Sequence, residues 1–105
     1  EAQANHMINI IRDFNLQRGA DLNAKLMEDI TTYHTTPVQA AEIANLAKVK
    51  HLIFYHLTPA PRNLTTETIF LRGVKEVREE WTLSNDGTMV VLPIGNKEII
   101  ISEIK

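Results

Sequence analysis

Two histidines lie where the predicted architecture lets an imidazole do chemistry. The first, His56, ends a run of apolar and β-branched residues and is followed at once by Leu57-Thr58-Pro59, so it lies at the carboxyl end of a predicted strand. Open α/β sheets bind ligands at that edge, and an imidazole there can ligate a divalent metal ion while an outer acceptor holds its second nitrogen. The alternative is a strand-end histidine hydrogen-bonded to a loop carbonyl.

The second histidine, His34, lies two residues before Thr36, the predicted N-cap of a helix. Unpaired N–H groups at a helix start favour a bound anion. A histidine beside them can donate to a phosphate, sulfate or carboxylate, or protonate a leaving group. The alternative is a loop histidine that covers the helix end. Because the helix and strand between His34 and His56 run antiparallel, we expect the two side chains at opposite ends of this unit, unless the loop with His34 folds over the strand ends.

The other candidates for chemistry are weaker. His51 is five residues from His56 along the strand, so the two point to opposite faces and cannot share a metal ion. His6 falls on the polar side of the first predicted helix and is expected in solvent. Residues 78–80 (Arg-Glu-Glu) are interpreted as a charged edge strand that resists further pairing. The sequence contains no Gly-rich phosphate loop, Gly-x-Ser-x-Gly elbow or His-Glu-x-x-His motif.

The elements that position these histidines begin with a helical half, residues 1–47. Apolar residues between Ala4 and Phe14 recur at helical spacing without an N-cap before them, so the chain is predicted to start inside a helix and to be a piece of a longer protein. Asp21 then caps a second predicted helix.

The third helix has the clearest start signal, and a strand follows it. Thr36 is the predicted N-cap, Pro37 the first helical residue and Gln39 the partner in a capping box. Residues 49–57 are predicted to form a buried strand whose partner lies outside the chain. The predicted buried face of the helix consists of Ala40, Ala41, Ile43, Ala44 and Ala47.

Residues 49–105 are expected to be mixed, with mostly strands. A short helix over 64–71 ends at Gly73. A strand over 74–83 is predicted to form a hairpin with 88–92 through Asn85-Asp86-Gly87. A turn at Gly95-Asn96 then leads into a last strand over 98–104. Without a linker or repeat, residues 1–105 are predicted to be a single α/β unit, with helices followed by a buried strand and a C-terminal β-hairpin or meander.

Composition limits the class of protein. The chain has 105 residues, 44% of them hydrophobic, and a formal net charge of -2, so we expect a folded, soluble protein, cytoplasmic or periplasmic, with no membrane partner. The slight acidity makes a nucleic acid the less favoured partner. The absence of cysteine excludes disulfides, thiolate zinc sites and cysteine nucleophiles.

Two segments carry a resemblance to a known family. Together they look like the C-terminal part of metallo-β-lactamase-fold hydrolases, most of all the ribonuclease Z and arylsulfatase-like branch. Members of that branch carry a His-Ser/Thr-Thr/Ser stretch, an Ala-Ala-rich helix and a hydrophobic strand that ends in a metal-ligand histidine. The resemblance continues through residues 70–74 and the turn at 86–87. The two segments are residues 33–44, YHTTPVQAAEIA, and residues 49–59, VKHLIFYHLTP.

The resemblance implies a fold, a cofactor and two roles. The fold is an αββα sandwich, of which this chain is the C-terminal portion. His56 matches the last ligand of the family's dinuclear, usually zinc, centre, and His34 matches the histidine beside the scissile phosphate in ribonuclease Z. The Thr-Thr-Pro that follows His34 is similar to the arylsulfatase-like branch, which argues against tRNA 3′ processing.

One departure from the family decides what the chain can do alone. The His-x-His-x-Asp-His cluster, the middle histidine and the bridging aspartate of the family are absent, and a two-metal hydrolase needs several such ligands. The chain is therefore expected to be inactive alone, to hold no zinc stably, to self-associate, and to need the N-terminal part of the same domain to act on a small-molecule ester. The competing hypothesis is a noncatalytic α+β interaction module.

Overall fold

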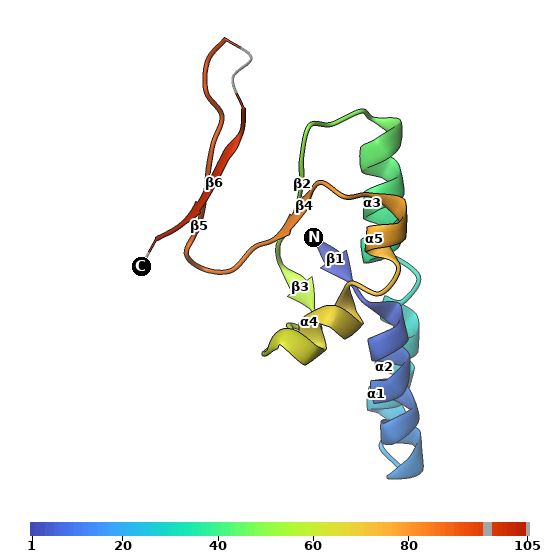
Figure 1. The fold of residues 1–105 in the computed structure, drawn as a ribbon. Coiled ribbons are helices and arrows are strands. Elements are labelled where there is room, and N and C mark those ends of the chain that lie inside the picture. The colour runs from blue at the N-terminus through green and yellow to red at the C-terminus, as the bar shows by residue number, and fades with distance from the viewer. Residues whose placement is uncertain (96–97, 105) are drawn as a thin grey trace.

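Helices and short strands alternate along the chain, which confirms the mixed α/β class (Figure 1). The structure is a computed structural model that describes residues 1–95 and 98–104. Its elements, in chain order, are β1 (Ala2–Gln3), α1 (Asn5–Gln17), α2 (Asp21–Ile30), α3 (Pro37–Leu46), β2 (Leu52–Phe54), β3 (Leu57–Thr58), α4 (Leu64–Phe70), α5 (Val74–Val77), β4 (Trp81–Leu83), β5 (Thr88–Val91) and β6 (Ile100–Glu103).

The strands pair two by two. β1 pairs with β3 in parallel, with Ala2 opposite Leu57, and β2 pairs with β4 in parallel, with Ile53 opposite Thr82. β5 and β6 form an antiparallel hairpin. Parallel neighbours need a long crossover. Helices α1 to α3 lie in the crossover from β1 to β3, and α4 and α5 lie in the crossover from β2 to β4.

The apolar spacing predicted that the chain starts inside a helix, but its first residues form a strand instead. Ala2 and Gln3 form β1, and α1 begins only at Asn5, after Ala4, whose side chain makes no cap. The backbone N–H groups before the helix are used in pairing: Gln3 donates to the carbonyl of Thr35 and Ala4 to that of Thr58. Strand pairing with distant segments therefore overrides the helical pattern at this end.

The start of α3 is confirmed in detail, and its buried face only in part. Thr36 and Gln39 form the capping box, with Pro37 at the first helical position. Ala41 and Ala44 are buried, but Ile43 is 57% exposed and Ala47 is exposed as well. Those last two were expected in the core; instead they face an open groove beside β2.

The apolar run over residues 49–57 is not one buried strand. It divides into β2 and β3 at Tyr55 and His56, and His56 has a φ of 48°. Within the run only Phe54 is buried. The partner of β2 was expected outside the chain, whereas β4 pairs with it from within.

Residues 74–83 were predicted to be a strand, but Val74–Val77 form the helix α5. Gly73, before it, has a φ of 88°, and a Cβ at that position would lie 3.0 Å from a methyl group of Val38. β4 then pairs with β2 rather than in a hairpin with β5, and β5 pairs with β6. Asn96, in the predicted turn before β6, lies outside the described residues.

The core lies where α3, α4 and α5 meet the parallel strands. Trp81 on β4 packs edge to face against Phe54 on β2, with ring centroids 6.4 Å apart. Burial of aromatic and aliphatic side chains here supplies most of the driving force for folding. The buried residues of this cluster are Ala2, Ala4, Ala41, Phe54, Phe70 and Val74.

Arg78 was expected on a charged edge strand, but it is buried, with 8% of its surface exposed. Its guanidinium donates to the carbonyl of Glu80, the side-chain oxygen of Asn45 and the carbonyl of Val49, at 2.8, 2.9 and 2.8 Å. It thus ties the C-terminal end of α3 to the start of β4.

The molecule is elongated, measuring 56 × 34 × 20 Å with a radius of gyration of 16.0 Å. A compact chain of this length has a radius of gyration of about 13 Å. Figure 1 shows the cause: the α1–α2 pair extends at one end and the β5–β6 hairpin projects from the body. Within residues 1–95 and 98–104, no helix combines the length and apolar character needed to cross a membrane.

Candidate functional site

The two histidines singled out in the sequence meet at one carboxylate, that of Glu1. Its Oε1 lies 3.0 Å from Nδ1 of His34, and its Oε2 lies 3.2 Å from Nδ1 of His56. His34 and His56 are 22 residues apart in the sequence, yet each contacts the Glu1 side chain through its Nδ1 atom. One acidic group therefore holds both.

β1 brings the three residues together. Ala2 is opposite Leu57 in the parallel pair of β1 and β3, which puts Glu1 beside His56. On its other side β1 receives the loop before α3, because the backbone of Gln3 donates to the carbonyl next to His34 at 2.8 Å. The expectation that the histidines lie at opposite ends of the helix–strand unit was wrong. When a helix and the next strand run antiparallel, the start of the helix and the end of the strand lie at the same end.

His56 has the most unusual backbone of the site. Its φ of 48° is in the left-handed region, which is uncommon for residues other than glycine, although histidine adopts it more often than most. The residue interrupts the strand there, and its side chain is 71% exposed. Strained backbone clusters at functional sites, although Lys48, which is outside the site, has a similar φ of 54°.

The charge of Glu1 fixes which nitrogens remain free. Hydrogen bonds from His34 first, and from His56 second, lower the pKa of the Glu1 carboxyl below its ordinary value of 4.5. An ionised carboxylate only accepts hydrogen bonds, so the Nδ1 of each ring donates to it. In the neutral imidazole this leaves Nε2 as the nitrogen with a lone pair.

His34 is more enclosed than His56, with 28% of its side chain exposed. The ring of Tyr33 lies against it, with centroids 4.9 Å apart and planes tilted by 42°. Tyr33 and Glu1 together hold the orientation of this imidazole.

A pocket of about 620 Å³ opens beside His56. Its lining includes the apolar residues Leu57, Ala60 and Pro61 and also residues 84–87, Ser-Asn-Asp-Gly, between β4 and β5. The hydroxyl of Ser84 donates to the carbonyl of Phe54 at 2.7 Å, which joins this wall to β2. The volume is in the range of small-molecule sites.

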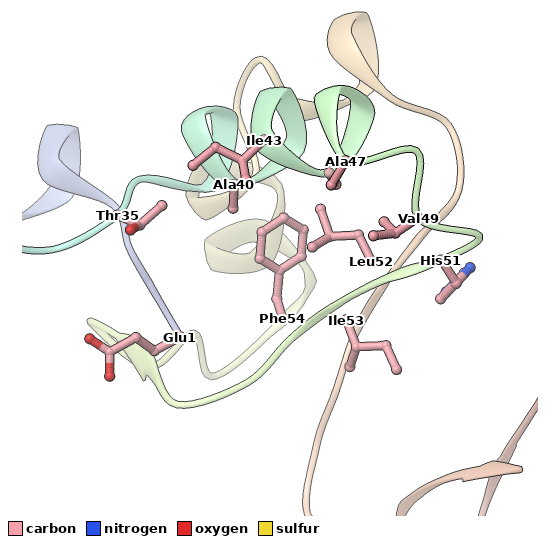
Figure 2. Close-up of a pocket in the computed structure, with 11 residues that line it drawn as sticks. Glu1, Thr35, Ala40, Ile43, Ala47, Val49, His51, Leu52, Ile53 and Phe54 are labelled. Carbon is pink, nitrogen blue, oxygen red and sulfur yellow. The ribbon is translucent and has the colours of Figure 1, made fainter. Parts of the chain in front are cut away.

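A second hollow, of about 440 Å³, runs between α3 and β2 (Figure 2). Glu1 lies at one end of it and His51 at the other, and most of the lining between them is apolar. Nε2 of His51 contacts Oγ1 of Thr82 on β4 at 2.8 Å, well away from Glu1.

His6 was expected in solvent, but its Nε2 lies 2.6 Å from the carbonyl of Ile69 at the end of α4. This histidine links α1 to α4 and is separate from the pair at Glu1. The structure therefore divides the four histidines into two that make structural contacts, His6 and His51, and two that share a carboxylate.

Metal ligation by the chain has clear limits. Over the described part of the sequence, no three or more histidine or acidic side chains are grouped so that they could hold a metal ion together. His56 has the arrangement of a single ligand, with Nδ1 on a carboxylate and Nε2 free, as is usual for metal-bound histidines. Both carboxylate oxygens of Glu1 contact imidazoles, so Glu1 is suited to orient a ligand histidine rather than to bind a metal ion itself.

Glu1 is the site residue that sequence reasoning missed. Its contacts are 33 and 55 residues away in the chain, and they depend on the pairing of β1 with β3, two strands of two residues each. Strands so short leave no periodic pattern. The one local signal was that Glu1 immediately precedes a small apolar residue, Ala2, and that is too common to indicate a site.

Comparisons with known proteins do not identify a relative of the chain. No protein-family model, curated protein or solved structure matches the chain. The chemistry of the site is therefore argued from its own geometry: one carboxylate, two imidazoles oriented by it, and a pocket that opens beside His56.

Proposed function

We propose that the chain forms part of the active site of a metal-dependent hydrolase with the metallo-β-lactamase fold, in the ribonuclease Z and arylsulfatase-like branch. The observation that carries the proposal is the contact of Glu1 with Nδ1 of both His34 and His56. These are the two histidines that the resemblance assigns to the metal centre and to the scissile bond, and the contact puts them in one site.

His56 is proposed as a metal ligand through Nε2. A carboxylate on the other ring nitrogen fixes the tautomer and raises the basicity of a ligating imidazole, and Glu1 has that position. The metal ions, usually zinc in this family, supply a hydroxide nucleophile near neutral pH when they are bound. The chain itself contributes the orientation of His56 and the wall of the pocket next to it.

His34 is proposed as the residue beside the leaving group. With Nδ1–H donated to Glu1, the imidazolium form of His34 can give its Nε2 proton to the departing oxygen or stabilise charge there. The ring of Tyr33 packs against the imidazole, with centroids 4.9 Å apart, which favours the orientation that Glu1 sets. Glu1 acts through the histidines and is a positioning residue.

The remaining metal ligands are proposed to come from the N-terminal part of the same domain, because one histidine cannot hold two ions. The substrate is a small ester whose organic part fits the 620 Å³ pocket beside His56. Sulfate esters, phosphodiesters, and lactams or lactones all remain in the proposal. The net charge of -2 makes a nucleic acid the less favoured substrate.

The test uses the longer protein to which the chain is proposed to belong, whose reading frame should encode a His-x-His-x-Asp-His cluster before Glu1. A panel of sulfate, phosphate and carboxylate esters is assayed with metal added and removed. His56→Ala removes a proposed metal ligand and should weaken metal affinity by at least the roughly 10- to 100-fold that the loss of a partner of such a ligand costs. His34→Ala should retain the metal but lower kcat by about 100-fold or more.

His51→Ala is the matched control, because His51 contacts Thr82 rather than Glu1; it should change neither metal content nor kcat. Full metal occupancy in His56→Ala would contradict the proposed ligand role. Tight zinc binding with turnover by the 105-residue chain would contradict its proposed inactivity alone.

The alternative, a noncatalytic interaction module, is favoured by one observation: the apolar groove beside α3, with Ile43 57% exposed. A reading frame without the upstream ligand cluster would support the module. A monomer in size-exclusion chromatography that binds little apolar dye would count against an uncovered fragment.

A further inference from the structure

The pocket beside His56 has an acidic side chain in its lining and, among the described residues, no lysine or arginine. The acid is Asp86, in the segment between β4 and β5. With a volume of about 620 Å³, the pocket has room for an organic group of moderate size. The carboxylate of Asp86 therefore sets the sign of charge that a molecule in this pocket meets on the side away from His56.

The polar side chains before Asp86 are already used within the chain. The hydroxyl of Ser84 donates to the carbonyl of Phe54 at 2.7 Å. The side-chain oxygen of Asn85 accepts from the backbone N–H of Gly87 at 3.1 Å. Asp86 is exposed, and within residues 1–95 and 98–104 its carboxylate makes no ion pair. Its acceptor oxygens are thus open to a ligand.

The turn that carries Asp86 is held on both sides. The backbone N–H of Thr88 donates to the carbonyl of Asn85 at 3.0 Å, and that of Ile104 donates to the carbonyl of Gly87 at 2.7 Å. A Cβ on Gly87 would lie 2.7 Å from the carbonyl oxygen of Ile104, so the end of the chain packs directly on this turn. A ligand that binds Asp86 therefore does not have to order the loop first, which lowers the cost of binding.

The apolar part of the lining indicates what the rest of the ligand is made of. Leu57, Ala60 and Pro61 can cover hydrocarbon, and burial of apolar surface against them favours binding. A cationic group on that hydrocarbon can form a charge-assisted hydrogen bond with the carboxylate, whereas an anionic group meets a like charge. The lining is therefore complementary to an apolar body that carries an ammonium group.

We propose that the pocket beside His56 selects esters whose organic part carries a positively charged amine, and that Asp86 is the residue that recognises this charge. The inference rests on the proposed function for the ester bond, and it adds the class of substrate. Asp86 determines specificity in this proposal and takes no part in breaking the bond.

Three probes that share one ring and differ in charge test the proposal on the 105-residue chain: benzylammonium, benzyl alcohol and benzoate. Binding is followed by the amide shifts of residues 84–87 in nitrogen-15 NMR. Benzylammonium should bind about two- to fivefold more tightly than benzyl alcohol, which is the size of effect that an ion pair in contact with solvent produces. Benzoate should bind more weakly than benzyl alcohol, and added salt should reduce both differences.

Asp86→Asn should remove the preference for benzylammonium, and the turn should still form because asparagine is favoured in turns. Asp86→Glu keeps the carboxylate and should leave benzylammonium the tightest of the three. Asp21→Asn is the matched control: it changes the net charge by the same amount, but Asp21 begins α2 and does not line this pocket. It should leave the order of the probes unchanged.

Equal affinities for the three probes, or no shift at residues 84–87 with any of them, overturn the proposal. So does a preference for benzylammonium that survives Asp86→Asn. A loss of metal in Asp86→Asn of the longer protein also overturns it, because Asp86 would then be a metal ligand. The binding measurements need neither metal nor turnover, so they fail separately from the hydrolase function, which fails if the upstream ligand cluster is absent.

Discussion

Two polar clusters hold α3 to its strands, one at each end of the helix. At the C-terminal end, Arg78 is 8% exposed and its guanidinium donates to three oxygens, those of Asn45, Val49 and Glu80. At the N-terminal end, the carboxylate of Glu1 receives one hydrogen bond from each of two imidazoles. Both clusters join segments that are distant in the sequence.

The clusters differ in burial and in what they leave free. In the Arg78 cluster the guanidinium is enclosed and has three acceptors, although the residues that supply these acceptors are themselves exposed. The Glu1 cluster is open to solvent and has a strained residue in His56, and among the described residues Nε2 of each ring has no hydrogen-bond partner. A buried and satisfied network stabilises the fold, whereas an exposed one with free nitrogens contributes little stability and can bind a ligand. Stability measurements should therefore separate the two.

The largest effect is expected from Arg78→Ala. The substitution removes a buried guanidinium together with its three hydrogen bonds, which join the C-terminal end of α3 to the start of β4. We expect a loss of about 3 kcal/mol in the free energy of unfolding, measured by urea denaturation followed by circular dichroism. Arg12→Ala is the control, because the guanidinium of Arg12 pairs with the adjacent, exposed Asp13; it should change stability by less than about 0.5 kcal/mol. Equal effects of the two substitutions would refute the structural role of Arg78.

The sequence correctly predicted those elements whose start or end is signalled by a few neighbouring residues. The start of α3 followed from Thr36, Pro37 and Gln39, which lie within four residues and contact one another. α5 was missed because Val74 and Val77 favour a strand by propensity. The left-handed backbone of Gly73 and the complete burial of Val74 outweigh that preference.

The sequence predicted the two imidazoles of the site but not the Glu1 carboxylate that joins them. His34 and His56 have local signals, a helix start and a strand end. Glu1 reaches them through a pairing between β1 and β3 that closes a loop of more than half the chain. For the same reason Arg78 was assigned to an edge strand: its acceptors on α3 and in the α3–β2 loop are about 30 residues away.

At the exposed Glu1 cluster we expect a smaller change in the free energy of unfolding, and one that stabilises the fold. His56 has a φ of 48°, which costs a residue with a Cβ about 1 kcal/mol and costs glycine nothing. Part of the gain is offset by the greater freedom of glycine in the unfolded chain. His56→Gly should therefore stabilise the fold by about 0.5 kcal/mol in urea denaturation, although it removes the proposed ligand.

Two neighbours test whether backbone strain is the cause. Lys48→Gly, at a φ of 54° and with no part in the site, should give a similar gain. Tyr55→Gly, next to His56 but without a positive φ, should instead lose about 1 kcal/mol. A loss of stability in His56→Gly comparable to that in Tyr55→Gly would mean that the Glu1 contact stabilises the fold, and the contrast between the two clusters would disappear.

The smallest effect concerns the charge of Glu1. Because its pKa is lowered in the folded protein, the unfolded chain takes up a proton first as the pH falls. The contribution of Glu1 to stability is therefore complete above pH 4.5 and is lost as the pH falls through the lower, folded pKa. Carbon-13 NMR of the Glu1 carboxyl should give a titration midpoint below 4.5.

Replacing each histidine in turn shows how much each one lowers the pKa of Glu1. The hydrogen bond from His34 is the larger cause of the lowered pKa, so His34→Ala should move the midpoint of Glu1 further toward 4.5 than His56→Ala does. The difference follows from geometry, because His34 is both closer to the carboxylate, 3.0 Å against 3.2 Å, and less exposed. Identical midpoints in the native chain and the two variants would mean that neither imidazole donates to Glu1 in solution. The exposed cluster would then lack the carboxylate that orients Nε2, while the buried cluster around Arg78 would be unaffected.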